Sequence, residues 1–521
     1  MANRYWVGGS DTWDATAGTK WSLTSGGAGG QAVPTTSDAV FFTAASGAST
    51  VTIDVNAVCL TLTMTGFTGT LAFGSNKISI AGNGTTILTG ATTYSVTGTP
   101  LIELTYAGAS GTRTFNPSAT TEANAISINV IAGTDIVRST GTNSYKNYNF
   151  TGFGGTLNNS IRNVYGNVIF NATMSHEAAA TALTFSATSG TQLFTSAKTL
   201  DFPITINGIG GTVQLQDSLT IGSTRTFTLT NGILDLFSKT LTAGLFSSSG
   251  SGTRSILFGT SNITINGSGT VWNTGTVTNF SYTGTPTVNI SNNSATATTV
   301  TTGALSESQA LNFNYTVGTY TLTDTSSVYK SLNFTGFTGT ASNSARTIYG
   351  NLTLVSGMTL TAGANATTFA TTSGTQTITT AAKTLDFPLT FNGVGGTFAF
   401  QDALTQGSTR AFTITNGTVQ LKAGVTSTVG SFVASSTAVK YLQSTTPGSQ
   451  ATISQASGTV SVSDLTIQDS NTAGSASWNA YVDFENTDAG NNDGWNFSLS
   501  PPYASYEPPI IIRSFTQPRR F

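Results

Sequence analysis

A long internal repeat constrains this 521-residue chain more than any other feature. The phrase YKNYNFTGFGGT begins at Tyr145 and returns as YKSLNFTGFTGT from Tyr329, at an offset of 184 (329 − 145). The phrase KTLDFP occurs at 198–203 and again at 383–388, so one inserted residue changes the offset to 185 (383 − 198). Repetition of this kind is typical of architectures in which similar units stack against one another.

The repeat supplies one complete copy with partial copies on either side, because a fainter echo, TMTGFTGT, occupies 63–70. We expect a Trp-rich N-terminal cap or anchor at 1–50 and a shortened first β-repeat at 51–144. A complete β-repeat follows at 145–328 and a truncated one at 329–430. A C-terminal β cap at 431–497 and a Pro/Arg-rich extended tail at 498–521 complete the expected organisation.

Within each copy, apolar residues alternate with Thr, Ser or Asn, as in TFTLTNG and AFTITNG, and Gly-rich turns separate the runs. This period of two predicts an all-β chain. Repeat units contain roughly 20–45 residues, so each long copy must hold several coils. We predict a right-handed β-solenoid rod with capped ends, with about 20 turns and a length on the order of 100 Å. Tandem β-sandwich domains of roughly 100 residues are the alternative, but no Pro/Gly linker separates the copies.

The composition excludes several classes of protein. Charged residues make up 8% of the chain and the formal net charge is −2, so no broad basic field is present to attract nucleic acid. Apolar residues are scattered singly, and none of the runs reaches the roughly 20 residues that membrane insertion by a helix requires. The 30 Phe and 15 Tyr supply enough apolar material for a core, which argues against disorder.

The single cysteine, Cys59, cannot form an internal disulfide, so packing and hydrogen bonds must supply rigidity. The opening residues MANRYWVGGSDTWD lack the basic and apolar regions of a secretory signal. We therefore expect assembly in a host cytoplasm and release by lysis as part of a virion. The alternative is an extracellular or cell-surface location reached by another route.

Tryptophan is concentrated near the two ends of the sequence, which hold five of the six. We interpret these side chains as plugs for the apolar ends of the stack, because terminal repeats need caps. An exposed aromatic platform for carbohydrate is the alternative. The five residues are Trp6, Trp13, Trp21, Trp478 and Trp495.

The tail from residue 498 differs in composition from the rest, since it carries five of the 12 Pro. Proline removes ladder donors and favours extended backbone. We interpret the tail as an extended arm that lies in a groove of a partner subunit, with a disordered end as the alternative. The expected anchoring residues are Ile510, Ile511, Ile512, Arg513, Phe515, Arg519, Arg520 and Phe521.

Catalytic constellations are scarce, and we expect no enzymatic activity. The sole histidine, His176, has no cysteine partner, which argues against a catalytic triad or a zinc site. Carboxylate pairs are the enzyme candidates, because polysaccharide hydrolysis uses two of them. These are Asp201 with Asp217 and their copies Asp386 with Asp402, for which structural turn roles are the preferred interpretation.

No cofactor is expected. The one dense acidic segment contains Glu485, Asp488, Asn492 and Asp493. Oxygen ligands at such short spacing can bind Ca²⁺ near Asp488 and Asp493, but their order does not fit an EF-hand loop. A hydrogen-bonded turn rich in Asn and Asp is the preferred interpretation.

Several phrases resemble a known group of proteins: RYWVGGSDTWD followed by VPTTSDAVFF, the TGFTGT and YGNLTLVSGMTL segments, and the closing DAGNNDGW. They are similar to Gly/Thr/Ser-rich virion appendage and structural proteins of tailed phages of aquatic bacteria, such as tail fibres, spikes and head fibres. The resemblance covers most of residues 1–497 and implies a β-rich, particle-attached and often trimeric protein. The N-terminal pattern also resembles the start of bacterial β-helical passenger and adhesin domains.

Three functions follow as expectations. The first is a structural protein of a phage particle, a tail fibre, spike or head decoration. Its partners would be other virion proteins, further copies of itself with a trimer favoured, and host surface polysaccharide. The second is a secreted bacterial β-helical adhesin or filament subunit, and the third is a polysaccharide depolymerase.

Overall fold

Alternation of inward apolar and outward polar side chains defines the strands of this protein in the computed structural model. In β14 (Ile126–Val130) Ile126, Ile128 and Val130 are buried, whereas the two residues between them are partly exposed. The structure describes residues 1–500, except 14–18, 142, 159–161, 305 and 326. The anchoring residues expected between Ile510 and Phe521 lie outside the described residues.

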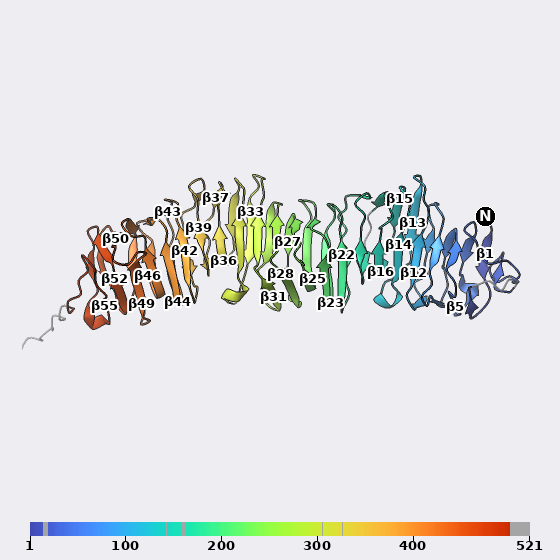
Figure 1. The fold of residues 1–521 in the computed structure, drawn as a ribbon, viewed down its shortest axis with the longest axis horizontal. Helices are drawn as coiled ribbons and strands as arrows, with labels where there is room; N and C mark the ends of the chain where they lie inside the picture. The colour runs from blue at the N-terminus through green and yellow to red at the C-terminus, as the bar shows by residue number, and fades with distance from the viewer. Residues whose placement is uncertain (14–18, 142, 159–161, 305, 326, 501–521) are drawn as a thin grey trace, which may run out of the picture. The chain divides into compact units, whose positions relative to one another are not determined.

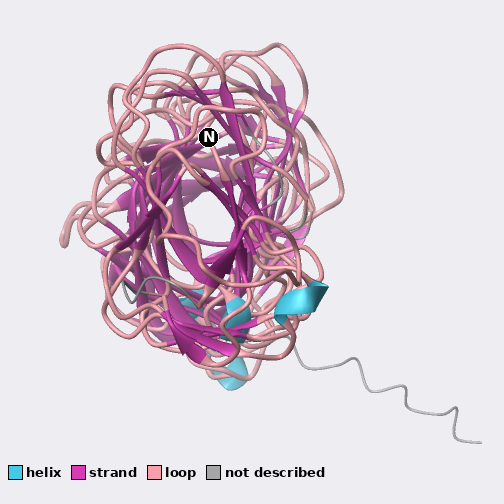
Figure 2. Cartoon of the chain, turned by 90° about the vertical axis from the view of Figure 1, so that its right-hand side faces the viewer, coloured by secondary structure: helices cyan, strands magenta, loops and turns pink. Residues whose placement is uncertain are grey.

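The chain divides into two compact units, Met1–Thr368 and Phe369–Phe521. In each unit short strands pair in parallel with the strands one coil away, so the chain winds as a β-solenoid (Figure 1). The described residues of the two units contain about 20 coils, with 2% helix. The predicted β-solenoid is confirmed, and the alternative of tandem β-sandwich domains is wrong. The strands form the walls of the coils and the loops lie outside them (Figure 2).

The register of the ladders measures each coil. Ile263 lies beside Val288, and Val288 lies beside Phe313, so each of these coils advances the numbering by 25 (288 − 263 and 313 − 288). Asn143 lies beside Arg162, which makes a shorter coil with an advance of 19 (162 − 143). Coils of this size place successive strands about 4.8 Å apart and stack equivalent side chains in columns.

The described strands of the first unit form four ladders, in which β1–β3 is the one antiparallel strand pair. The first ladder contains β1 (Asn3–Trp6), β3 (Trp21–Ser22), β4 (Ala39–Phe41), β7 (Thr61–Thr63), β10 (Leu88–Thr89), β13 (Thr112–Asn116), β15 (Ile136–Ser139), β17 (Thr156–Asn158) and β20 (Ser175–His176). The second contains β2 (Asp11–Thr12), β5 (Thr50–Thr52), β8 (Thr70–Ala72) and β11 (Ser95–Thr97).

The third ladder contains β6 (Ala57–Cys59), β9 (Ile78–Ile80), β12 (Leu101–Leu104), β14, β16 (Asn143–Asn149), β18 (Arg162–Val164), β19 (Val168–Ile169), β21 (Leu183–Phe185), β22 (Thr191–Thr195), β23 (Ile204–Leu215), β25 (Thr226–Asp235), β27 (Leu245–Ser247), β28 (Arg254–Gly259), β30 (Gly269–Thr274), β31 (Phe280–Gly284), β33 (Thr298–Thr302), β35 (Thr321–Asp324), β37 (Thr340–Ala341) and β40 (Thr359–Leu360). The fourth contains β24 (Leu219–Thr220), β26 (Leu241–Ala243), β29 (Asn262–Ile265), β32 (Thr287–Ile290), β34 (Leu311–Tyr315), β36 (Ser327–Asn333), β38 (Arg346–Ile348) and β39 (Leu352–Thr353).

The second unit repeats the same arrangement. One ladder contains β42 (Thr375–Thr379), β44 (Leu389–Phe400), β46 (Ala411–Leu421), β48 (Ser431–Val433), β49 (Lys440–Ser444), β52 (Leu465–Gln468) and β55 (Thr487–Asp488). The others contain β43 (Thr384–Leu385), β45 (Thr405–Gln406), β47 (Thr426–Val429), β50 (Ala451–Gln455) and β53 (Ser470–Ala473), and the pair β51 (Thr459–Ser461) and β54 (Ser477–Asn479). Short 3-10 helices interrupt the coils at η1 (Ala44–Ser46), η2 (Glu122–Asn124), η3 (Glu307–Gln309) and η4 (Val482–Phe484).

Glycine is required where a long strand turns a corner of the coil. Gly232 in β25 and Gly417 in β46 hold equivalent places in the two copies, with φ angles of 88° and 82°. A Cβ at either position would approach the carbonyl oxygen of Gly208 or Gly393 to 2.4 or 2.3 Å. Both the left-handed backbone and the close coil beneath therefore exclude a side chain at these corners.

Candidate functional site

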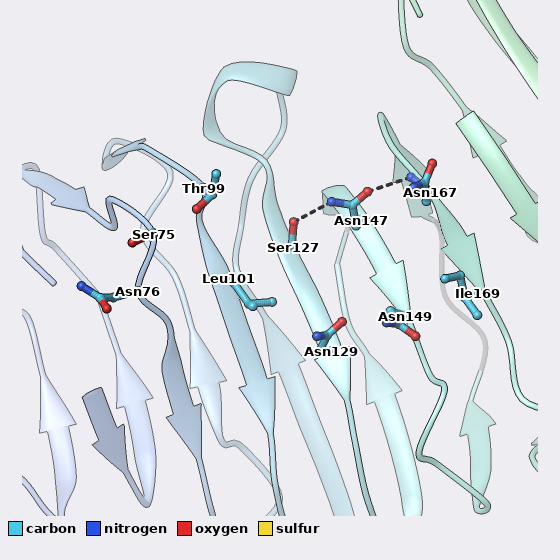
Figure 3. Close-up of a pocket in the computed structure, with 10 residues that line it drawn as sticks. All are labelled: Ser75, Asn76, Thr99, Leu101, Ser127, Asn129, Asn147, Asn149, Asn167 and Ile169. Carbon is cyan, nitrogen blue, oxygen red and sulfur yellow. Dashed lines mark hydrogen bonds between the residues drawn. The ribbon is translucent and has the colours of Figure 1, made fainter. Parts of the chain in front are cut away.

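The most distinctive polar site is a shallow groove on the outer face of the third ladder, with a volume of about 330 Å³. Strands β12, β14, β16 and β19 form its floor, and amide and hydroxyl side chains line it (Figure 3). Its position follows from the alternation described above, because each strand buries its apolar residues and turns its polar residues outward. We name it the asparagine groove, after Asn129, Asn147, Asn149 and Asn167 in its lining.

One row of the groove joins successive coils by hydrogen bonds. Asn147 Nδ2 donates to Ser127 Oγ at 3.0 Å, and the backbone N–H of Asn167 donates to Asn147 Oδ1 at 2.8 Å (Figure 3). The Asn167 Oδ1 in turn accepts from the backbone of Leu193 at 2.9 Å. Most hydrogen-bonding groups of these amides are engaged within the protein, so these residues connect successive coils.

The neighbouring row presents amides that are less occupied. Asn129 and Asn149 lie directly opposite each other in the parallel β14–β16 pair. The Asn149 Oδ1 accepts from the backbone and hydroxyl of Thr151 at 2.9 and 2.6 Å. Among the described residues, no partner is found for the Asn149 amide nitrogen or for the Asn129 side chain. The amide donors of both residues and the Asn129 oxygen are therefore available to a ligand in the groove.

A second hollow of about 360 Å³ shares Thr99, Ser127 and Asn147 with the groove and extends it toward η2. A register shift between β14 and β16 accommodates an extra residue in β16. Lys146 of β16 contacts Glu122 of η2, with 2.8 Å between Nζ and Oε1. The carboxylate at this end of the groove is thus neutralised by a lysine.

The other carboxylate close to the groove is also paired. Glu103 lies beside Asn129 in the β12–β14 register. Its Oε1 accepts from Lys77 Nζ at 2.6 Å. With both carboxylates matched by lysines, the asparagine groove has little net charge.

The amide row recurs in the second copy. Asn314 and Asn333 follow Asn129 and Asn149 at offsets of 185 and 184 (314 − 129 and 333 − 149), and they are again paired in register. Asn314 Nδ2 donates to Asn289 Oδ1 on the preceding coil at 3.1 Å. Lys330 and Glu307 of η3 also reproduce the Lys146–Glu122 ion pair. The asparagine pair and the lysine–glutamate ion pair of this face were therefore duplicated with the fold, whereas Ser331 stands where the first copy has Asn147.

The first pair of carboxylates considered for catalysis has structural partners. Asp201 accepts from Arg225 Nε at 2.7 Å, and Asp386 accepts from Arg410 Nε at the same distance. The hydrogen bond from Arg225, with its positive charge, lowers the pKa of Asp201 despite the opposing effect of desolvation. The Asp201 carboxylate is therefore not held in the protonated form that a general acid requires.

The second carboxylates cap turns. Asp217 accepts from the backbone N–H of Ala197 at 2.5 Å, and Asp402 accepts from that of Ala381 at 2.6 Å. Both alanines have a left-handed backbone, with φ of 60° and 53°. The carboxylates hold strained turns in place, which is the role preferred from the sequence.

His176 lies inside the first unit. Its ring stacks edge-on against Phe170 and Phe202, with centroids 4.7 and 5.5 Å apart. Burial lowers its pKa to about 3, and the charges of Arg162 and Lys198 act in the same direction. The neutral imidazole is therefore part of the interior and faces no reaction site.

The N-terminal tryptophans form one buried cluster. Trp6, Trp13 and Trp21 are at most 1% exposed, and Trp21 lies 5.1 and 5.0 Å from the rings of the other two. Phe42 continues the stack toward Phe67 at 5.2 Å. Buried rings cannot present a flat face to a sugar, so these residues form no exposed carbohydrate platform.

The C-terminal pair is arranged similarly within the second unit. Trp478 and Trp495 are 4% and 8% exposed, with ring centroids 5.0 Å apart. Phe432 packs against both rings, at 5.9 and 6.2 Å. Each cluster places large apolar surface in the interior of its own unit, which is compatible with the interpretation as end caps.

The acidic segment forms a hydrogen-bonded turn. Asp488 Oδ1 accepts from the backbone of Gly490 at 2.9 Å and from Asn492 Nδ2 at 2.6 Å, and Asp493 accepts from Gln450 at 2.9 Å. No group of three or more His, Cys, Asp or Glu able to hold a metal occurs among the described residues. Glu485 is exposed and adopts a left-handed backbone at the end of η4.

Sequence reasoning missed the asparagine groove. Its signal was present as Asn at outward-facing positions of runs such as ISINV and YNF, but a pattern within one strand does not reveal which residue lies opposite on the next coil.

Comparisons with protein-family models, with curated proteins and with solved structures find no match. None of the helices in the described part of the chain is long and apolar enough to cross a membrane.

Proposed function

We propose that this protein is a structural β-solenoid of a bacteriophage particle, a tail fibre, spike or head fibre, whose asparagine groove contacts neutral glycans of the host surface. The observation that supports this proposal is the row formed by Asn129 and Asn149 and its repetition at Asn314 and Asn333. The resemblance of the end segments and repeat phrases to phage appendages supports the location on a particle.

Neutral sugars suit the chemistry of the groove. An amide offers both a donor and an acceptor, and each sugar hydroxyl can serve in either role. With Glu103 and Glu122 paired to lysines, the groove has no strong charge to favour an acidic polymer. A shallow polar groove gives weak affinity at each site, but repeated sites on one polysaccharide strengthen attachment through multivalency.

In this proposal the protein acts through binding and mechanical support rather than catalysis. The carboxylates that a depolymerase would require are engaged by Arg225, Arg410 and turn backbone. Partners would be other virion proteins and further copies of the chain, with a trimer as the proposed assembly. Release by lysis would bring the particle into contact with new host cells.

The location is tested by mass spectrometry of purified phage particles beside the surface fraction of uninfected cells from the same culture. We expect peptides from this chain in the particles at a stoichiometry consistent with an appendage. Peptides confined to the cell-surface fraction would overturn the particle assignment and support the adhesin alternative.

The glycan contact is tested with the full chain on immobilised neutral polysaccharides of the host. We expect the double variant Asn129→Ala, Asn149→Ala to lose about tenfold in affinity, because each lost hydrogen bond to a ligand weakens binding. Thr228→Ala is the matched control, since Thr228 is an outward residue of β25 away from the groove. Equal binding by the double variant and the control would exclude the groove as the glycan site.

A further inference from the structure

Most buried arginines of this solenoid donate hydrogen bonds to oxygen acceptors, which compensate the positive charge. Arg113 donates from Nε and Nη2 to the two oxygens of Asp135, both at 2.8 Å. Arg346 donates from Nε to Asp324, and Arg254 donates to surrounding backbone carbonyls. The guanidinium cannot be deprotonated in a protein, so its charge must be compensated where it lies. Among the described residues, the buried arginines are Arg113, Arg162, Arg254 and Arg346.

Arg162 is the exception. It is 0% exposed, yet none of its side-chain nitrogens has a hydrogen-bond partner among the described residues. Its guanidinium carbon lies 5.6 Å from the ring centroid of Tyr148 and 5.3 Å from that of Phe202. These cation–π contacts stabilise the charge through the faces of the guanidinium. They leave its in-plane N–H donors unsatisfied.

The second copy of the repeat shows which group is missing beside Arg162. Arg162 pairs in register with Asn143, and Arg346 pairs with Ser327, so the two arginines hold equivalent positions at an offset of 184 (346 − 162). The ladder position of Asp324, next to Val300, corresponds to that of Ser139, next to Phe115, at an offset of 185 (324 − 139). The first copy therefore has a serine where the second copy has the carboxylate that neutralises its arginine.

The groups around Arg162 are hydroxyls and a neutral imidazole, which carry no negative charge and can donate hydrogen bonds. The hydroxyls of Ser139 and Tyr145 are hydrogen-bonded to each other, and the Tyr148 hydroxyl has no partner among the described residues. Both ring nitrogens of His176 are buried without a partner there as well. The Tyr148 hydroxyl and the single N–H of the neutral imidazole can donate to an anion beside Arg162, whose charge meets no carboxylate among the described residues.

We propose that a small monovalent anion of the halide class binds beside Arg162, near Ser139 and Tyr148, at the position that the Asp324 carboxylate holds in the second copy. The anion supplies the negative charge that a water molecule cannot. The site is structural, because it lies on the buried side of β16, whereas the asparagine groove lies on the outer side of the same strand. It stands or falls independently of the glycan contact.

The test is thermal unfolding of the full chain, followed by circular dichroism, in sodium chloride or bromide against sodium gluconate at equal ionic strength. We expect chloride to raise the wild-type unfolding temperature by about 2 °C in a saturable manner, because a ligand that binds only the folded state stabilises it. Ser139→Asp places the carboxylate of the second copy beside Arg162 and should abolish this difference. Arg162→Met removes the charge and should also abolish it.

Asp324→Ser is the converse variant, since it gives the second copy the serine of the first. It should enlarge the dependence on chloride. A wild-type protein equally stable in chloride and gluconate would overturn the proposal, as would a chloride effect that persists unchanged in Ser139→Asp. If these variants do not fold, anomalous diffraction from wild-type crystals in bromide decides the matter: a bromide peak beside Arg162 supports the site, and its absence there excludes it.

Discussion

The two copies that begin at Tyr145 and Tyr329 share their outer turns but differ in their interiors. The ion pairs Asp201–Arg225 and Asp386–Arg410 have the same geometry, with 2.7 Å between Nε and Oδ1 in each. The residue inserted in the second copy also lies in a surface turn. Where the first copy has the left-handed Ala197, the second has two consecutive left-handed alanines in the same turn. After this turn, equivalent residues of the two copies again differ by a constant offset.

Inside the coils, by contrast, chemistry changes between copies. Tyr148 and His176 of the first copy correspond to Leu332 and Leu360 of the second, both at an offset of 184 (332 − 148 and 360 − 176). The first copy thus surrounds its buried arginine with aromatic faces, whereas the second gives Arg346 the carboxylate of Asp324. This difference indicates that backbone geometry fixes the turns, whereas the interior tolerates different side chains as long as their volume and charge are compensated.

The largest expected effect comes from breaking the charge compensation of the second copy. Asp324→Asn leaves the buried Arg346 without its counter-charge and should lower the free energy of unfolding by about 3–5 kcal/mol. The measurement is urea unfolding followed by circular dichroism. Asp386→Asn is the matched control at an exposed ion pair. Equal losses in the two variants would show that burial does not distinguish them.

A smaller effect should follow from the single histidine. Because burial and neighbouring cations lower the pKa of His176 from 6.5 to about 3, the unfolded state binds a proton below pH 6.5 that the folded state does not. The free energy of unfolding is therefore not reduced by His176 above pH 6.5, and it decreases progressively as the pH falls toward 3. Between pH 7 and 5 the loss in the free energy of unfolding should be about 2 kcal/mol.

The variant His176→Leu gives the first copy the residue of the second and should remove this pH dependence. The measurement is the urea midpoint of both proteins at pH 5 and pH 7. The contribution of His176 is refuted if the variant shows the same decline as the wild type.

The smallest effect is expected at the shared outer turns. Asp201→Asn and Asp386→Asn should each cost less than about 1 kcal/mol, because exposed ion pairs are weak and screened by salt. The two losses should be similar and should shrink at high salt. A clear difference between them would mean that the surroundings of the two turns are less alike than their geometry indicates.

Much of the fold could be predicted from the sequence. Alternation in phrases such as TFTLTNG specifies strands, and the long repeat with no linkers specifies stacking. The asparagine groove and the buried ion pairs could not be predicted, because they depend on which residue lies one coil away. The numbering advances by 19 from Asn143 to its neighbour Arg162, but by 25 from Ile263 to its neighbour Val288 (162 − 143 and 288 − 263).

The sequence by itself thus determined the strand class, the repetition and the concentration of tryptophan near its ends. Only the tertiary structure decided that Asn129 meets Asn149, that Arg346 meets Asp324 and that Arg162 meets no carboxylate among the described residues. The physical reason lies in the coil itself. Alternation is a local property of one strand, whereas the neighbours of a side chain in a solenoid belong to the coils above and below. Their register depends on the length of every intervening loop.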